Sequence, residues 1–213
     1  QQSLENAANA GVESIVCVGT TLNSNLKNLE FSLRQQPVKI FLGLGIHPND
    51  IKSETIADAL EFIRKNIGKA VCVGEIGLDF WQKGIKKNPP KKAEQEEVFR
   101  KQLALAEEFA LPVSIHSRGS WQRCLELLKE SRVKKAVFHW YSGPTDILQE
   151  IIAQGFFISA TPALRYSPQH QEAIKTAPIE RIFLETDTPV FYGEKEGACL
   201  PARQGFRAEP KDV

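Results

Sequence analysis

The chain has 213 residues, of which 42% are hydrophobic and 25% charged, as in a globular protein that buries a sizeable core. The formal net charge of +1 excludes an overall basic field, so any contact with nucleic acid must come from a local patch. No apolar run approaches the roughly 20 residues of a membrane span, and the four scattered cysteines form no C-x-x-C pair, so we expect a cytoplasmic protein with neither a membrane nor an obligate protein partner.

Short apolar runs alternate with longer amphipathic segments along the whole chain. Each short run is bounded by turn residues, as strands buried in a parallel sheet are. These runs predict strands at Glu13–Val18, Lys39–Leu44, Ala70–Glu75, Pro112–His116, Lys135–His139, Gly155–Ser159 and Arg181–Glu185. The longer segments predict helices at Asn23–Gln36, Ser53–Ile67, Ala93–Ala110, Ser120–Glu130, Thr145–Gln154 and Pro168–Lys175.

Strict alternation of strand and helix indicates a parallel sheet with right-handed crossovers. The chain contains no G-x-G-x-x-G motif, which argues against a dinucleotide-binding sheet. Seven strands are predicted, whereas a complete barrel has eight. The chain opens on what resembles the end of a helix, closed by Gly11, and finishes in an irregular segment, Phe191–Val213. We therefore expect residues 1–213 to form a single α/β domain, a TIM-type (β/α)8 barrel that lacks its first strand and last helix.

Ionisable side chains stand at the ends of five predicted strands: His47, Glu75, His116, His139 and Asp187. In a parallel barrel these ends meet at one rim, and imidazole with carboxylate is the usual ligand set of a catalytic divalent cation. Taken singly, each histidine has a structural explanation, and each carboxylate is explained equally well as a helix cap or an ion-pair partner. Chance does not favour three of four histidines at strand ends; we expect the fourth, His170, at the surface.

Five motifs carry a resemblance to a known family. In chain order they are GIHP (45–48), GEIGLDF (74–80), PVSIHSR (112–118), FHWYSG (138–143) and ETDTP (185–189). Together they resemble the TatD-related deoxyribonucleases over essentially the whole chain. The resemblance implies a TIM barrel of the metal-dependent hydrolase group that acts as a nuclease with two adjacent divalent metal ions, Mg²⁺ in function or alternatively Zn²⁺ or Mn²⁺.

The resemblance also implies roles for the strand-end residues. Glu75 resembles the carboxylate that bridges both metals, and His116 and His139 resemble the other ligands of one metal. Asp187 resembles a ligand of the second metal and the group that orients or activates the attacking water. His47 resembles a histidine near the substrate mouth that contacts phosphate. The family's opening D-x-H-x-H motif, which supplies two histidines to one metal, is absent from these residues, so one metal site is expected to be incomplete.

The segment that follows Glu75 reads DFWQKGIKKNPPKK and carries several lysines, among them Lys83, Lys86 and Lys87. Lysines pair with phosphates as point charges and add salt-dependent affinity; a merely solvated loop is the alternative. Indole rings that follow strand ends, Trp81 and Trp140, are suited to stacking on unpaired bases; packing against neighbouring loops is the alternative. Arg118 is suited either to clamping a phosphate or to pairing with a carboxylate.

These residues favour a divalent-metal-dependent nuclease that hydrolyses DNA phosphodiester bonds exonucleolytically, from single strands or ends. One alternative keeps the metal and changes the substrate to an amide, a lactone or an aminoacyl ester. A third option is a non-catalytic protein that retains a metal site for stability.

Overall fold

Seven parallel strands form one curled sheet in the computed structural model, which describes residues 1–52, 55–193 and 205–213. Each strand pairs with the next one along the chain. The strands are β1 (Ser14–Val18), β2 (Lys39–Leu44), β3 (Ala70–Gly77), β4 (Val113–His116), β5 (Ala136–Phe138), β6 (Phe157–Ala160) and β7 (Ile182–Leu184). This sheet confirms the expectation of a parallel α/β barrel with seven strands.

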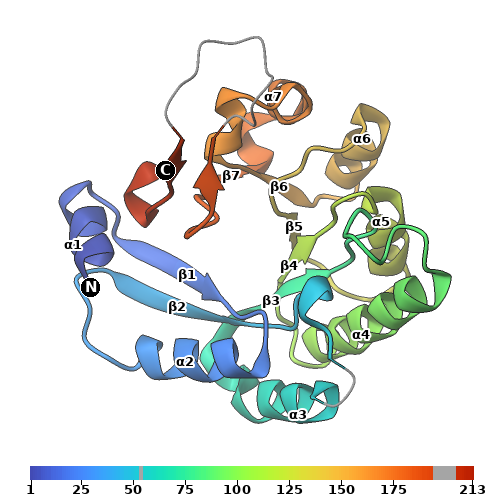
Figure 1. The fold of residues 1–213 in the computed structure, drawn as a ribbon, viewed down its shortest axis with the longest axis horizontal. Coiled ribbons are helices and arrows are strands. Elements are labelled where there is room, and N and C mark those ends of the chain that lie inside the picture. Colours follow the sequence, from blue (N-terminus) through green and yellow to red (C-terminus); the bar gives the residue numbers. More distant parts are fainter. Residues whose placement is uncertain (53–54, 194–204) are drawn as a thin grey trace.

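The helices lie on the outside of the curled sheet (Figure 1). They are α1 (Gln2–Asn9), α2 (Leu22–Ser32), α3 (Ile56–Asn66), α4 (Pro89–Glu108), α5 (Trp121–Glu130), α6 (Thr145–Ala153) and α7 (Pro168–Thr176). The expected start of α3 at Ser53 lies outside the described residues. Helix α4 begins earlier than the expected Ala93, because Asn88 caps it and Pro89 and Pro90 occupy its first turn, where proline is tolerated.

Within the described residues, β1 and β7 are the two edges of the sheet. Both edges carry apolar side chains that are more than half exposed: Val16, Phe183 and Leu184. On this side of the molecule α1 lies beside the C-terminal turn (Figure 1), and Asn6 Nδ2 donates a hydrogen bond to Glu209 Oε2 at 2.9 Å. The C-terminal segment is less irregular than expected, since Phe191–Tyr192 and Phe206–Arg207 pair as a short antiparallel ladder.

Two buried amide side chains hold the backbone that follows β2. From α2, the Asn25 amide donates to Gly45 O at 2.7 Å and accepts from Gly45 N at 3.1 Å. From α4, the Gln102 amide donates to Ile46 O at 3.0 Å and accepts from Ile46 N at 2.7 Å. Buried backbone groups without partners are costly, so these contacts fix the path of the chain immediately before His47.

A third buried amide side chain holds the residue that follows His47. Gln95 of α4 donates to Pro48 O at 3.1 Å and accepts from the backbone nitrogen of Asp79 at 3.0 Å. The same side chain therefore ties the residue after His47 to the segment after β3. Because Gln95 and Gln102 are two helical turns apart, they lie on one face of α4, and that face anchors two strand ends of the barrel.

The expectation that His170 lies at the surface is wrong. Its ring is fully buried beneath the first turn of α7. Nδ1 lies 2.7 Å from the carbonyl oxygen of Tyr141, to which it donates, and Nε2 accepts from Thr161 N at 3.0 Å. Burial lowers the pKa of His170. The ring is thus a neutral link between the segments after β5 and β6, a contact that the pattern of one short helix does not reveal.

Three cysteines, Cys17, Cys72 and Cys124, are free thiols, as expected for a chain without C-x-x-C pairs, and Cys199 lies outside the described residues. None of the helices in the described ranges combines the length and the apolar character that crossing a bilayer requires.

Candidate active site

A cavity of about 520 Å³ opens at the carboxyl ends of the strands, the end of a parallel barrel where side chains from different strands converge. All five strand-end residues that the sequence singled out line it: His47, Glu75, His116, His139 and Asp187. Four of them end or follow strands β2, β4, β5 and the edge strand β7, whereas Glu75 lies inside β3, which runs two residues past the expected end. The structure therefore brings together groups that are up to 140 residues apart in the chain.

Glu75 lies at the centre of the group. Its Oε1 is 3.0 Å from Nδ1 of His116, 2.9 Å from Nε2 of His139 and 3.5 Å from Nε2 of His47. Burial alone would raise the pKa of Glu75, but the three rings outweigh it and hold that pKa well below its ordinary value. Glu75 is thus an ionised carboxylate enclosed by imidazole nitrogens.

The rings of His116 and His139 are both held from behind by carboxylates. Nε2 of His116 lies 3.1 Å from Asp79 Oδ2, and Nδ1 of His139 lies 3.3 Å from Glu185 Oε2. Since a carboxylate accepts hydrogen bonds, these nitrogens carry the ring protons. The opposite nitrogens, 3.4 Å apart, face Glu75. Each donates to that carboxylate while its ring is protonated, and each offers a lone pair to a cation once that proton is lost. Carboxylates oriented in this way behind imidazoles are typical of metal-ligating histidines.

The charges of this group also suit a cation. Burial acts to lower the pKa of His116 and His139, but the flanking carboxylates outweigh it and raise the pKa of both rings. A cation bound among these nitrogens would take the place of protons, so its affinity would increase with pH. The ligand atoms offered by His47, Glu75 and His116 all lie within 4.8 Å of one another. The donor set therefore fits a divalent metal ion.

His47 differs from the other two histidines in its hydrogen bonds. Its Nδ1 accepts a hydrogen bond from the backbone nitrogen of Asn49 at 3.1 Å, so in the neutral ring the proton is on Nε2. The Nε2 atom faces Glu75, and the ring meets that of His116 edge to face with centroids 4.5 Å apart. In this tautomer His47 presents an N–H group to the cavity, which suits an anionic ligand, and its Nε2 joins Glu75 and His116 around a cation only if it gives up that proton.

Two carboxylates of the site, Asp79 and Glu185, were not among the residues expected from the sequence. Asp79 is fully buried and, besides His116, accepts hydrogen bonds from Asn49 Nδ2 at 2.8 Å and Arg118 Nε at 3.0 Å. Burial opposes ionisation, but these partners lower the pKa of Asp79 strongly. Both carboxylates stand inside quoted motifs, GEIGLD and ETD, so an acidic residue within a few positions of a candidate ligand was the available signal.

Glu185 organises the segment after β5. Besides the ring of His139, it accepts hydrogen bonds from Trp140 N at 2.9 Å and from Ser159 Oγ. Asp187, two residues further on, lines the cavity. Burial raises the pKa of Asp187, and the nearby negative charges of Glu75 and Glu185 act in the same direction against His139. The cavity is thus lined by two carboxylates of lowered pKa, Glu75 and Asp79, and by Asp187, whose affinity for a proton is increased.

The residues expected to touch substrate are more dispersed. Trp81, Arg118 and Trp140 line the cavity. Arg118 is anchored by its ion pair with Asp79, whereas the Trp140 ring packs beside Tyr192 with centroids 5.3 Å apart.

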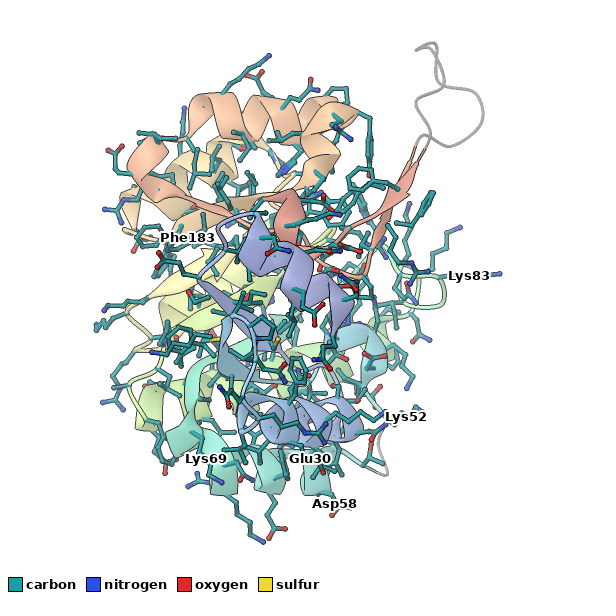
Figure 2. The ribbon with its side chains drawn as sticks, turned by 90° about the vertical axis from the view of Figure 1, so that its left-hand side faces the viewer. Glu30, Lys52, Asp58, Lys69, Lys83 and Phe183 are labelled. Atoms are coloured by element: carbon teal, nitrogen blue, oxygen red, sulfur yellow. The ribbon has the colours of Figure 1, made fainter. Side chains whose placement is uncertain are left out.

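Lys83, Lys86 and Lys87, which we call the lysine turn, are exposed between β3 and α4 and do not line the cavity. Figure 2 shows Lys83 extending away from the body of the molecule. In the described part of the chain, none of these three ammonium groups forms an ion pair. Lys91 and Lys92 belong instead to the first turn of α4, where Lys91 pairs with Glu94.

Comparison with known proteins agrees with this geometry. Residues 1–212 match the family described as TatD related DNase. Deoxyribonuclease TATDN3 of Homo sapiens is 32% identical over 97% of this chain and 78% of the human protein. The 3'-5' ssDNA/RNA exonuclease TatD of Erwinia tasmaniensis is 31% identical over 87% of this chain and 72% of its own length.

The fold agrees as well. The crystal structure of YJJV, a TatD homologue from Escherichia coli, superimposes with a TM-score of 0.80 at 27% identity, over 99% of this chain and 78% of the bacterial one. Since the family match extends over nearly every residue and the human relative is 32% identical, this chain belongs to the TatD-related deoxyribonucleases, a family of metal-dependent hydrolases.

Proposed function

We propose that this protein is a divalent-metal-dependent nuclease that hydrolyses DNA phosphodiester bonds, working from ends on single-stranded DNA. The observation that carries this proposal is the ionised Glu75 between two carboxylate-oriented rings, His116 and His139, at the base of an open cavity. The names of the human and Erwinia relatives, a deoxyribonuclease and a 3'-5' ssDNA/RNA exonuclease, support the choice of substrate.

Glu75, His116 and His139 would hold one cation, and Glu75 with Asp187 would contribute to a second. We expect Mg²⁺ first, with Mn²⁺ and Zn²⁺ as alternatives. Such a cation, when bound, supplies a Lewis acid for the phosphoryl group and lowers the pKa of water at the site. The described residues supply only part of the second ligand set, which is why we regard that position as incomplete here.

The remaining steps belong to side chains of this protein. The Nε2–H group of His47 donates to a phosphate oxygen, and Arg118, fixed by Asp79, adds a positive charge to the same side of the cavity. Asp187 orients the attacking water and accepts its proton, a role that its raised pKa favours. The indoles of Trp81 and Trp140 contact bases, and the lysine turn attracts the backbone from outside the cavity.

Hydrolysis of an amide, a lactone or an aminoacyl ester would use the same cation but would not need the cationic groups around it. Arg118 and the exposed ammonium groups of the lysine turn therefore favour a polyanionic substrate over these neutral ones. A non-catalytic protein that keeps a metal ion for stability would not need an open cavity lined by Arg118 and by the exposed indole ring of Trp81.

The test is digestion of end-labelled single-stranded DNA by the wild type and by Asp187→Asn, with Mg²⁺, Mn²⁺ or Zn²⁺ and a chelator control. The asparagine variant should fold normally and lose about 10²- to 10⁴-fold in rate, the usual contribution of a general base. Asp58→Asn, an exposed carboxylate of α3, is the matched control. Near-normal turnover by Asp187→Asn would show that another group activates the water, and no digestion with any metal would end the nuclease proposal.

A further inference from the structure

Two tryptophans from different segments meet at the mouth of the cavity. Trp81 belongs to the turn after β3 and Trp121 to the first turn of α5, and both line the cavity that contains Glu75. Their rings stand edge to face, with centroids 5.2 Å apart and an interplanar angle of 89°. Trp121 is itself 6.4 Å from the buried ring of Tyr141. The pair is therefore supported from the interior of the protein.

Each indole also rests against a glycine. A Cβ atom at Gly119 would lie 2.2 Å from Cδ1 of Trp81, and one at Gly143 would lie 2.6 Å from Cγ of Trp121. Real Cβ atoms do not approach other atoms so closely. Gly119 has in addition a φ of +71°, which disfavours any other residue. Glycine at both positions thus leaves room for the two rings to pack close to the main chain.

Despite this support, the Trp81 side chain is 55% exposed. A core residue would be covered, and a loosely attached surface residue would not need a glycine beneath it. The neighbour of Gly119 in sequence is Arg118, whose guanidinium is held by Asp79 at 2.9 Å. A fixed planar ring beside a fixed cation matches the two parts of a nucleotide, the base and its phosphate.

We propose that Trp81 and Trp121 form a nucleobase subsite, in which the exposed face of Trp81 stacks on an unpaired base next to the phosphate that Arg118 contacts. Trp121 does not touch the base. It is a positioning residue, whose edge-to-face contact with Trp81 sets the angle of the Trp81 ring. The subsite rests on the proposed nuclease function and gives it a preference for single strands, because a base paired within a duplex must first be unpaired and unstacked, at a cost in free energy, before it can stack on Trp81.

The test compares the dissociation constants of an oligothymidylate and an abasic oligomer of equal length. Both carry a fluorophore, and binding is followed by anisotropy at fixed salt in chelator, so no turnover intervenes. The wild type should prefer the base-bearing oligomer by about 5- to 150-fold, the value of one stacked base. Trp81→Ala should lower this ratio several-fold, leaving only what Trp140 contributes, whereas Trp81→Phe should retain most of it. The control is Phe109→Ala, which removes an exposed aromatic ring at the C-terminal end of α4. This variant should keep the wild-type ratio.

Two further variants examine how the ring is held. Trp121→Ala should reduce the preference with Trp81 intact, and Trp121→Phe should restore it. Gly119→Ala should displace the Trp81 indole and lower the ratio of dissociation constants as Trp81→Ala does. If the Gly119 variant fails to fold, the two Trp81 variants still test the subsite. Equal wild-type affinity for the two oligomers, or an unchanged ratio in Trp81→Ala, would overturn the subsite and leave the nuclease proposal standing. A wild type that binds neither oligomer and hydrolyses no DNA would instead overturn the proposed function itself.

Discussion

Replacing Gln102 with leucine removes the amide that holds the chain immediately before His47. The Gln102 side chain is 1% exposed and Ile46 is 3% exposed, and the two hydrogen bonds between them measure 2.7 and 3.0 Å. Leucine has a similar volume, so little cavity forms, but the N–H and C=O groups of Ile46 stay buried without partners. Each such group costs about 1–3 kcal/mol, which predicts a decrease in stability of about 2–6 kcal/mol, offset by about 1 kcal/mol for burying a more apolar side chain.

Equilibrium urea denaturation followed by circular dichroism measures this change. The midpoint should fall while the dependence on denaturant stays constant, since the exposed surface is the same. Gln122→Leu is the matched control, because the Gln122 amide is exposed and bonds only to Glu126 among the described residues; its effect should remain within about 0.5 kcal/mol. A decrease below about 1 kcal/mol for Gln102→Leu would refute the reasoning, since a single unsatisfied buried group should cost at least that much.

Three other perturbations test the metal ligands, the lysine turn and the buried histidine. Glu185→Gln keeps an acceptor oxygen but removes the negative charge behind the His139 ring, and it should weaken binding of Mn²⁺ by about 10- to 100-fold in titration calorimetry; unchanged affinity would mean that the charge of Glu185 does not strengthen His139 as a ligand. Alanine at all three positions of the lysine turn should flatten the log–log salt dependence of single-stranded DNA binding by about 0.7 for each phosphate that no longer pairs with a lysine, and an unchanged slope would make the turn a solvated surface. The matched control for this variant carries alanine at Lys69, Lys134 and Lys135. Burial lowers the pKa of His170 in the folded protein, so as the pH falls the unfolded chain binds this proton before the folded chain does. The contribution of neutral His170 to the free energy of unfolding should therefore be complete above about pH 7 and should decline as the pH falls below about 6.5. His170→Gln should reduce this decline in urea denaturation between about pH 7.5 and 5.5, and an identical decline would exclude His170 as its source.

Much of the fold follows from local patterns. A parallel strand buried on both faces must be apolar along its length, and its helix must be amphipathic, so the alternation of the two patterns predicts a barrel with seven strands. The direction of the chain then predicts more: every strand of a parallel sheet ends at the same rim. A polar side chain at a strand end therefore has a predictable place, and this is why His47, Glu75, His116 and His139 could be assigned to one cavity from the order of residues alone.

What the sequence did not reveal depends on the direction and the partners of side chains. Nothing in the spacing shows that Asp79 lies behind His116, 37 residues away, or Glu185 behind His139, 46 residues away. These pairs form only when neighbouring strands take their final register, and they decide which nitrogen of each ring faces the cavity. The same limit explains the error at His170, since the buried face of a short helix is chosen by the segments that pack upon it. Sequence patterns determined where along the barrel each group lies; only the tertiary structure decided how each group is oriented, because orientation is set by contacts between residues far apart in the chain.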